Sequence, residues 1–550
     1  MNQLPTAWSS DHGIAWQHEL VGYGQSAPVM LNNKVFVTSV EGPMCEKLVV
    51  QCLDLSSGES LWQYVRATSQ GHASNYMNAR AAPTPLVDQD AVYAFFETGD
   101  FVCLDHAGNL LWHRNEAESF GKFENNHGLG SSPTMDDQNL YLLIEHDGPS
   151  SLSAINKKSG ETIWQTARES TKSWASPIIA NTSNDQSFVV VSSGGTVTGY
   201  SPKDGQPQWQ IDGIEGNTVP SPTASENLLL VGARLPEFAN DGQVKANCCL
   251  DLSQITDGQP KVLWRAEKAI CEYASPVTHE GYAYFVNKAN VLHCIDAAGG
   301  EVVYRKRLSL NCWATPVIAN DALFFFGKNG QTKIIQAGPE FVEIASNGLW
   351  DLENPPAPEQ YVEFTEDRGG QGGHGHGSNG HGSAGHGAAG YGAAGHGAAG
   401  HGEGGHGAAG HGEGGHAATG HPSGGHPAKG EAAEGHAASA GKPSAASKGG
   451  PSSRPGGGMV ARMLAGDKND DGILEGDEIP GMFRPMLSRI DTDGDGKINQ
   501  KELEKMAKSF AERRKDAAAS ARDPIVYGVA AASGKIVVRT GTRLYVIDGK

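Results

Sequence analysis

A short segment ending in proline recurs seven times in the first 346 residues, and this repetition constrains the fold more than any other feature of the sequence. Most copies continue with an apolar run about eight residues later, a second run that ends in a polar turn, and a glycine followed by an aromatic residue. The recurring prolines are Pro28, Pro85, Pro133, Pro177, Pro222, Pro276 and Pro316. Each unit therefore contains four strands within 40 to 57 residues, which predicts a β-propeller blade.

The aromatic residue that closes each unit occupies a fixed repeat position. A single blade cannot bury both of its faces, so we expect each ring to fill the gap to the next blade rather than to contact a ligand. These residues are Trp62, Trp112, Trp164, Trp209, Trp264 and Tyr304. A second column, on the third strand, repeatedly holds cysteine, which packs there as a small hydrophobic residue. Its members are Cys52, Cys103, Cys249 and Cys294.

The two ends of the chain carry the parts of one further unit. Residues 525–548 supply three strands without a closing aromatic residue, and residues 13–20 supply one strand with Trp16 in that position. Because an unpaired sheet edge invites aggregation, we expect the two ends to pair and close the ring. The fold class is therefore mainly β: an eight-bladed propeller formed by residues 13–346 and 525–548.

The charge and hydropathy of the chain exclude several partners. The formal net charge is −19 over 550 residues, so nucleic acids and anionic membranes would be repelled and cations are the more natural ligands. No apolar stretch reaches the roughly 18 residues of a transmembrane helix, so we expect no membrane span. The N-terminal residues lack the features of a secretory signal, which leaves two interpretations: a cytoplasmic protein, or an exported one whose leader lies outside this sequence.

Residues 347–458 are expected to form a linker between blades seven and eight. From about residue 369 it is rich in glycine and histidine, with repeats such as HGAAG and HGEGG, and offers nothing apolar for a core, so it is predicted to be disordered. Its histidines suit either weak binding of zinc, nickel or copper or a spacer whose charge rises below about pH 6.5, and we favour the spacer. They are His374, His376, His381, His386, His396, His401, His406, His411, His416, His421, His426 and His436.

Two loops with the spacing D-x-[DN]-x-[DN]-G-x5-E follow and resemble an α-helical EF-hand pair over residues 459–513. Calcium prefers about seven oxygen ligands, which this spacing supplies. In the first loop they are Asp467, Asn469, Asp471, the carbonyl of Ile473, and Glu478. In the second they are Asp491, Asp493, Asp495, the carbonyl of Lys497, and Glu502. Gly472 and Gly496 permit the sharp turns, and Leu474 and Ile498 are expected to pair between the loops.

Connectors after the second and fourth strands of each blade meet at one rim of a propeller, where a ligand of the central funnel would be contacted first. The candidate pocket residues are Arg80, His127, Trp174, Asn217, Glu272 and Trp313, with Asn75, Tyr76, Asn126, Tyr273 and Asn311 beside them. The alternative is that these side chains only satisfy backbone groups near the axis. Cys271 and Cys312 lie in adjacent connectors and would form either a disulfide or, as we favour, two free thiols.

The S-x-P start, the L-D-x-x-S-G-E-x-x-W turn and the count of eight units resemble the quinoprotein-like, or pyrroloquinoline quinone (PQQ) type, propeller family. This resemblance implies the fold, and it also favours an extracytoplasmic location. Many members are non-catalytic scaffolds and others are quinone-dependent dehydrogenases with an adjacent-cysteine disulfide. Cys248 and Cys249 match that disulfide only superficially, because Cys249 belongs to the repeated cysteine column, so PQQ is not expected.

These observations predict a calcium-binding, non-catalytic propeller scaffold with two Ca²⁺ sites and a protein or polymer partner at the rim. The alternative is a PQQ-dependent oxidoreductase of the alcohol or sugar dehydrogenase type, which would need a calcium site and a catalytic aspartate in the funnel. No spacing in the sequence locates that set.

Overall fold

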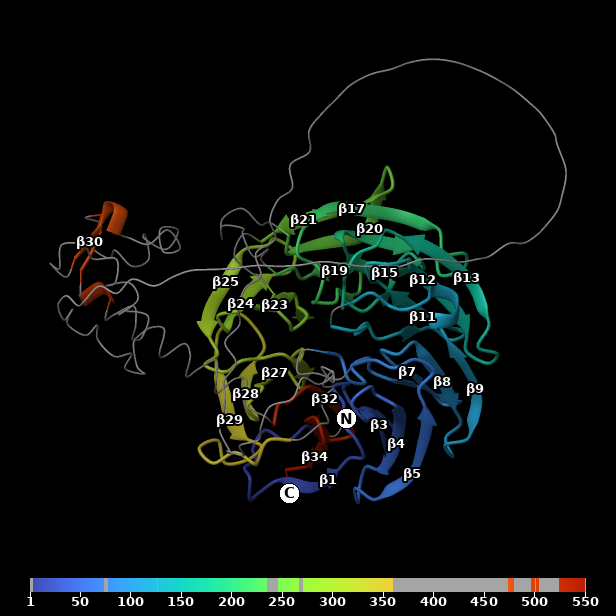
Figure 1. The fold of residues 1–550 in the computed structure, drawn as a ribbon. Helices are drawn as coiled ribbons and strands as arrows, with labels where there is room; N and C mark the ends of the chain where they lie inside the picture. The colour runs from blue at the N-terminus through green and yellow to red at the C-terminus, as the bar shows by residue number, and fades with distance from the viewer. Residues whose placement is uncertain are drawn as a thin grey trace, which may run out of the picture. The chain divides into compact units, whose positions relative to one another are not determined.

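The computed structural model describes residues 3–73, 78–125, 127–234, 246–266, 271–359, 473–478, 496–499, 501–503 and 524–549. Their strands form eight four-stranded antiparallel sheets around a common axis (Figure 1). The predicted eight-bladed propeller is therefore confirmed.

The first four blades follow one another along the chain, each with its strands in sequence order. Blade 1 is made of β2 (Val29–Leu31), β3 (Lys34–Glu41), β4 (Lys47–Asp54) and β5 (Ser60–Ala67). Blade 2 is made of β6 (Leu86–Val87), β7 (Val92–Phe95), β8 (Asp100–Leu104) and β9 (Leu110–Asn115). Blade 3 is made of β10 (Thr134–Met135), β11 (Asn139–Ile144), β12 (Ser150–Asn156) and β13 (Thr162–Arg168). Blade 4 is made of β14 (Ile178–Asn181), β15 (Ser187–Ser193), β16 (Gly195–Tyr200) and β17 (Pro207–Ile214).

The remaining four blades complete the ring, and a few short elements lie outside them. Blade 5 is made of β18 (Thr223–Ser225), β19 (Leu228–Val231), β20 (Cys248–Thr256) and β21 (Gln259–Arg265). Blade 6 is made of β22 (Val277–His279), β23 (Tyr282–Val286), β24 (Val291–Asp296) and β25 (Val302–Arg307). Blade 7 is made of β26 (Val317–Ala319), β27 (Ala322–Phe326), β28 (Gln331–Gln336) and β29 (Glu343–Gly348). Blade 8 is made of β32 (Gly528–Ala532), β33 (Lys535–Arg539), β34 (Arg543–Ile547) and β1 (Ile14–Glu19). The other described elements are α1 (Ala117–Phe120), β30 (Leu474–Glu475), η1 (Gly476–Glu478) and β31 (Lys497–Ile498).

The two ends of the chain share blade 8, as the sequence predicts. Strand β1 pairs antiparallel with β34, and Trp16 lies opposite Val546 in that ladder. Figure 1 shows both chain ends in this blade, with blue β1 beside red β34. The inner strand β32 pairs with β33, so that Ala531 faces Ile536 as Met30 faces Val35 in blade 1. The eighth unit therefore has the same register between its first two strands as the first unit.

The closing aromatic residues dock onto the next blade. Five of these tryptophans donate the indole Nε1–H to a backbone carbonyl in the turn between the third and fourth strands of the following blade. These bonds are Trp16 to Leu55 (3.0 Å), Trp62 to His106 (3.0 Å), Trp112 to Lys157 (2.8 Å), Trp164 to Pro202 (2.9 Å) and Trp264 to Ala297 (2.8 Å). The expectation that the aromatic residues act as wedges between blades is confirmed.

Small residues lie opposite these rings on the third strand. Cys52 pairs with Trp62, Cys103 with Trp112, and Cys249 with Trp264 across the ladder. Tyr304 likewise faces Cys294. A small side chain is needed there because the ring lies across the strand. This explains the repeated cysteine column without any ligand.

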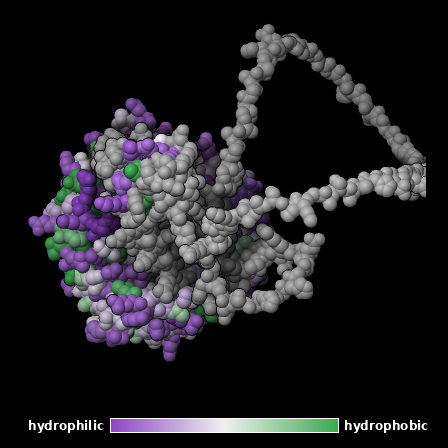
Figure 2. Space-filling model, turned by 60° about the vertical axis from the view of Figure 1, so that its left-hand side comes forward, coloured by the Kyte–Doolittle hydropathy of each residue, from purple (hydrophilic) through white to green (hydrophobic). Residues whose placement is uncertain are grey.

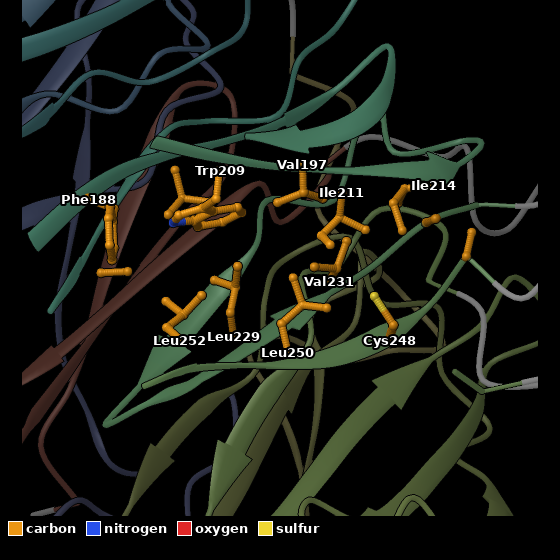
Figure 3. Close-up of a cluster of buried hydrophobic side chains, with 14 residues drawn as sticks. Phe188, Val197, Trp209, Ile211, Ile214, Leu229, Val231, Cys248, Leu250 and Leu252 are labelled. Carbon is orange, nitrogen blue, oxygen red and sulfur yellow. The ribbon is translucent and has the colours of Figure 1, made fainter. Parts of the chain in front are cut away.

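Trp209 is an exception within this pattern. It is buried in the cluster between blades 4 and 5 with Phe188, Leu229 and Leu252 (Figure 3), but its Nε1–H has no hydrogen-bond partner. In blade 5, β20 continues to Thr256, so the turn that offers a carbonyl in other blades is displaced. The indole therefore contributes packing alone at this joint.

A second set of bonds connects the blades nearer the axis. At each joint from blade 1 to blade 7, the backbone N–H before the recurring proline donates to the hydroxyl of the equivalent Ser or Thr in the next blade. The bonds are Ala27 to Thr84 (3.1 Å), Thr84 to Ser132 (2.9 Å), Ser132 to Ser176 (2.9 Å), Ser176 to Ser221 (2.9 Å), Ser221 to Ser275 (3.0 Å) and Ser275 to Thr315 (3.2 Å). We call these the inter-blade hydroxyl bonds. In blades 8 and 1 the corresponding residues are Gly528 and Ala27, which carry no hydroxyl.

The propeller extends beyond its predicted boundaries at two places. Leu4 and Trp8 are buried between blades 7 and 8, where Trp8 N–H donates to Asn347 Oδ1. After β29, Trp350 packs near Tyr545, and Glu359 accepts hydrogen bonds from Thr540 Oγ1 and Thr542 N–H. The first residues of the predicted linker thus belong to the closing blade. Within the described residues, no helix has the length and apolar character needed to cross a membrane.

Candidate functional site

The described parts of the two predicted calcium loops lie side by side. Strand β30 pairs antiparallel with β31, so that Leu474 faces Ile498, as expected from the sequence. Both side chains are fully buried, and Leu503 is buried with them. Beside this ladder, Lys497 Nζ lies 2.5 Å from Glu475 Oε2. A short two-stranded contact therefore joins the two loops.

The glutamate at position 12 folds back over its own loop in both cases. Glu478 Oε2 accepts the N–H of Glu475 at 3.4 Å, and Glu502 Oε2 accepts the N–H of Asn499 at 3.1 Å. Asn499 Oδ1 in turn accepts the N–H of Glu502 at 3.1 Å, so this pair forms a reciprocal cap at the start of the helical turn 501–503. In both loops the last carboxylate thus accepts the N–H of the residue at position nine, which is Glu475 in the first loop and Asn499 in the second.

The backbone at Gly496 supports the sharp turn predicted there, with φ at +79°, a region that glycine enters without strain. The other predicted ligands lie outside the described residues. They are Asp467, Asn469, Asp471, Asp491, Asp493 and Asp495. The predicted turn residue Gly472 and the histidines of the Gly/His-rich tract also lie outside the described residues. The calcium sites therefore remain a prediction, with part of their frame observed.

Two of the predicted rim residues belong to a chain of aromatic rings across the closing joint. Trp313 lies 5.2 Å from Tyr273 and 6.4 Å from Tyr527, measured between ring centroids. Tyr527 Oη is 2.9 Å from Tyr23 Oη, and the guanidinium of Arg80 lies 4.5 Å from the Tyr23 ring centroid. The structure therefore brings Trp313 and Arg80 into one array, although they come from different blades.

The remaining predicted rim residues are held by local partners. His127 and Trp174 have ring centroids 5.7 Å apart, and Trp174 Nε1–H donates to the Gly128 carbonyl. The buried Asn217 accepts the N–H of Gly195 at 3.0 Å, which is the backbone-satisfying role named as the alternative. Glu272 Oε1 lies 3.6 Å from Arg234 Nη2. The described contacts thus place the six predicted residues in four local groups. Asn75, Tyr76 and Asn126 lie outside the described residues.

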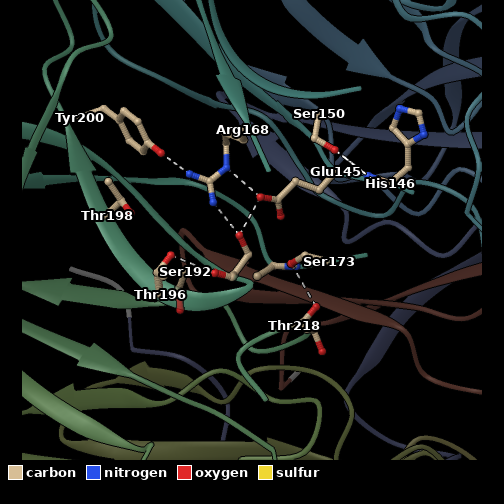
Figure 4. Close-up of polar contacts among 12 residues, drawn as sticks. Glu145, His146, Ser150, Arg168, Ser173, Ser192, Thr196, Thr198, Tyr200 and Thr218 are labelled. Carbon is tan, nitrogen blue, oxygen red and sulfur yellow. Dashed lines mark hydrogen bonds and ion pairs between the residues drawn. The ribbon is translucent and has the colours of Figure 1, made fainter. Parts of the chain in front are cut away.

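Buried charges at the ends of the second strands were missed by the sequence analysis. Between blades 3 and 4, Arg168 Nε lies 2.8 Å from Glu145 Oε1, which also accepts the Ser193 hydroxyl at 2.7 Å (Figure 4). Burial lowers the pKa of Arg168, but the charges of Glu145 and Tyr200 and the hydrogen bonds to both together outweigh it, so the net shift of that pKa is upward. Glu145 and Arg168 occupy rim-side positions, but their side chains are engaged with protein groups.

A second buried acid lies between blades 1 and 2. Both carboxylate oxygens of Glu97 accept the N–H of Ala81, at 3.0 and 2.8 Å. Burial raises the pKa of this carboxyl to about 7, although the Ala81 N–H opposes the shift. Ala81 and the neighbouring Cys45 both have positive φ, +44° and +52°. The only sequence signal for Glu97 and Glu145 was a glutamate close after an apolar strand run.

The described cysteines are free thiols and all are buried. Cys248 packs in the cluster of blades 4 and 5, whereas Cys249 packs in the cluster of blades 5 and 6. They therefore point to opposite faces of β20, as the repeat alignment predicts. Cys271 and Cys312 are also free in the structure.

Exposed large hydrophobic side chains lie mostly on the outermost strands of the blades. Those on these strands are Leu61, Val65, Leu110, Leu111, Ile163, Val262, Val302, Val303 and Ile344. In the view of Figure 2, the hydrophobic residues form small separate patches among hydrophilic ones. The described part of this face thus offers scattered apolar contacts.

Three comparisons place the chain among known proteins. No curated protein sequence matches it. The crystal structure of BamB from Moraxella catarrhalis has 12% sequence identity and a TM-score of 0.45, over 61% of this chain and 91% of that chain. A europium-containing methanol dehydrogenase has 13% identity and a TM-score of 0.42, over 63% of this chain and 84% of that chain. Sqt1 from Saccharomyces cerevisiae has 13% identity and a TM-score of 0.42, over 63% of this chain and 88% of that chain. Such distant likenesses carry no functional argument.

The family comparison is more direct. The model of the family described as outer membrane protein assembly factor BamB matches residues 2–128, 120–219 and 252–337. These segments contain blades 1 to 4 and blade 6, with the end of blade 5 and most of blade 7, and they cover more than half of the chain. The chain therefore belongs to the BamB-type family of PQQ-like propeller repeats.

Proposed function

We propose that this chain is a calcium-binding, non-catalytic propeller scaffold that recognises a protein or polymer partner at its rim. The observation that carries the calcium assignment is the matched placement of Glu478 and Glu502. In each loop the position-12 carboxylate is held against the position-nine N–H. Two loops that share both the ligand spacing and this placement support two sites of the same kind.

The ladder between the loops supports coupling of the two sites. Leu474 and Ile498 are fully buried, so a shift of one strand moves the other loop. Calcium is a hard cation that takes six to eight oxygens, and a bidentate glutamate at position 12 contributes two of them. Ion binding at one loop should therefore help to order the second.

Calcium titration of the full chain by isothermal calorimetry tests the assignment. We expect two bound ions per chain, and Glu478→Gln or Glu502→Gln should each weaken one site by about tenfold or more, because one oxygen and one charge are lost. Glu19→Gln, an exposed acid on β1, is the matched control and should bind as the unaltered chain does. Absence of binding at millimolar calcium, or unchanged binding in both loop variants, would refute the calcium assignment.

The partner is proposed to be protein, with a polymer as the alternative, because the family that the chain belongs to is described as an assembly factor. The rim carries aromatic rings, among them Tyr273, which is 42% exposed. Aromatic residues are enriched where proteins bind one another. A photo-crosslinking residue at Tyr273 should capture the partner, and the same residue at Leu111 on the outer strand β9 should not. Protease or glycosidase digestion then identifies the class, and equal capture at both positions contradicts a rim site.

The non-catalytic part of the proposal has its own test. The chain is incubated with PQQ and calcium, and dye reduction is followed with alcohols and sugars as substrates. Substrate-dependent turnover would overturn the scaffold assignment in favour of an oxidoreductase. A rate equal to that of the protein-free control would support it.

A further inference from the structure

Opposite the rim, the turns between the first and second strands of neighbouring blades approach one another. Between blades 2 and 3 a lysine fills this gap. Lys157 Nζ lies 2.5 Å from Asp88 Oδ2 of blade 2 and donates to the Asp136 and Asp137 carbonyls of blade 3, at 3.2 Å each. The side chains of Lys157 and Asp88 are only 10% and 19% exposed. A cation therefore holds these two turns together.

The same positions in blades 6 and 7 carry a different set of residues. Asp88 lies three residues after Pro85, and His279 lies three residues after Pro276. Lys157 N–H donates to a turn carbonyl of its own blade, and Ala337 N–H makes the equivalent bond to Asp321 in blade 7. Blade 7 therefore has alanine where blade 3 has the bridging lysine.

The gap beside Ala337 contains three potential metal ligands. One nitrogen of His279 and one carboxylate oxygen each from Glu280 and Asp321 lie within 4.8 Å of one another. His279 Nε2 is already 3.1 Å from Asp321 Oδ1. Among the ion pairs of the described residues, neither carboxylate is matched by a lysine or arginine. Two carboxylates and an imidazole thus lie together between blades 6 and 7. At the equivalent position between blades 2 and 3, the cation is the ammonium group of Lys157.

We propose that His279, Glu280 and Asp321 form a binding site for a first-row divalent metal ion such as Zn²⁺, which joins the turns of blades 6 and 7 as Lys157 joins those of blades 2 and 3. Zinc takes nitrogen and carboxylate oxygen at about 2.0–2.2 Å, so the ligand atoms must lie roughly 3.5 Å apart. Rotation of the exposed Glu280 side chain closes the remaining gap. The imidazole favours zinc, nickel or cobalt over calcium and magnesium, which prefer oxygen alone.

Hydrogen exchange on the full chain, followed by mass spectrometry with and without ZnCl₂, tests this site locally. Zinc bound elsewhere, including on the Gly/His-rich tract, does not alter this readout. We expect zinc to slow exchange in peptides that contain the turns at 279–281 and 319–321. His279→Ala and Asp321→Asn should raise the zinc concentration needed by about tenfold or more. The exposed His12→Ala is the matched control and should respond as the unaltered chain does.

A third variant separates loss of the site from loss of the fold. Ala337→Lys places an ammonium group where Lys157 has one, so the two turns should exchange slowly without zinc and no longer respond to it. Thermal unfolding of all variants checks that the propeller is intact. Failure of zinc at about 1 mM to slow exchange in the unaltered chain, or a response kept in Asp321→Asn, would overturn the proposal, since structural metal sites depend on their ligands.

Discussion

The joints within blades 1 to 7 differ in chemistry from the two joints of blade 8. The continuous blades are connected by inter-blade hydroxyl bonds from Ala27 through to Thr315, and each uses a residue of the repeat. Blade 8 is assembled from both ends of the chain, and its repeat position holds Gly528. The inter-blade hydroxyl bonds therefore stop at blade 8, although the indole bond from Trp16 to Leu55 still crosses from blade 8 to blade 1.

Blade 8 is held instead by groups that the other blades do not have at these positions. Arg539 is completely buried, and its guanidinium donates to the Ser26 side chain and to the Thr38 carbonyl in blade 1. Glu359 accepts hydrogen bonds from the turn after β33, and Trp8 packs over the joint with blade 7. Burial lowers the pKa of Arg539 to about 9 despite the charge of Glu359.

This difference has a physical reason. A joint within the continuous chain gains from the short connector that already holds neighbouring blades together, and it adds the hydroxyl bond of the repeat to the packing between the blades. The closing joint must overcome the entropy of bringing distant segments together. It does so with a full strand pairing, a buried charged group and packing from both flanks.

The largest expected effect follows from removal of the C-terminal strands. Deletion of residues 525–550 leaves β1 without its partner and exposes the flanks of blades 1 and 7, so the ring should open and the protein should aggregate or unfold. We expect the thermal midpoint to fall by more than about 10 °C. Deletion of the tract 369–458 is the control and should leave the midpoint unchanged. Equal midpoints for both deletions would contradict closure by the chain ends.

Arg539→Ala should have the next largest effect. It removes the charged donor from Ser26 and Thr38 and leaves their buried acceptors without it, at a cost of about 4 kcal/mol in the free energy of unfolding. Urea unfolding measures this, with Lys306→Ala on exposed β25 as the control. A loss below about 1 kcal/mol would show that packing, rather than this guanidinium, closes the ring.

At the joint of blades 1 and 2, the contribution of Glu97 to the free energy of unfolding should depend on pH. Its folded pKa of about 7 is raised above the ordinary 4.5, so its favourable contribution is complete below pH 4.5 and is lost as the pH rises through 7. The difference in unfolding free energy between the unaltered chain and Glu97→Gln should change by about 3 kcal/mol across this window. A difference that is constant with pH would contradict the buried carboxyl.

Loss of one inter-blade hydroxyl bond should cost less. Ser221→Ala leaves the Ser176 N–H without its acceptor, which should lower the unfolding free energy by about 1–2 kcal/mol. Ser183→Ala, on an exposed turn of blade 4, is the matched control. An equal result for both would show that these bonds do not stabilise the joints.

The repeat explains which parts of this fold could be predicted from the sequence. A residue at one position of the repeat can be compared with the residues at the same position in the seven other blades. For this reason the strands, the aromatic wedges and the cysteines opposite them were predicted correctly. Trp209 shows the limit of that comparison, because the longer β20 displaces its acceptor. Glu359 and Trp8 lie outside the repeat units, and Arg539 stands on β33 where blade 1 has Thr38. The roles of all three depend on distant segments that only the folded ring brings together.

The candidate sites follow the same division. The two predicted calcium loops are local patterns, so their ligands are predicted from spacing alone. The rim residues were selected by position alone, and their described contacts fall into four groups because neighbouring connectors supply different partners. Tyr23 and Tyr527 were missed because they meet only across the closing joint.

The smallest expected effect comes from adding an inter-blade hydroxyl bond to the joint between blades 8 and 1. Ala27→Ser places a hydroxyl where blades 2 to 7 have one, within reach of the Gly528 N–H, and should raise the free energy of unfolding by about 0.5–1 kcal/mol. The reciprocal change should fail, because a Cβ at Gly528 would lie 2.4 Å from Ala27 Cα. Gly528→Ala should therefore destabilise the protein. If Ala27→Ser gains nothing while Ser221→Ala loses stability, the hydroxyl bonds depend on the geometry of the continuous chain, and strand pairing with Arg539 is the sufficient closure.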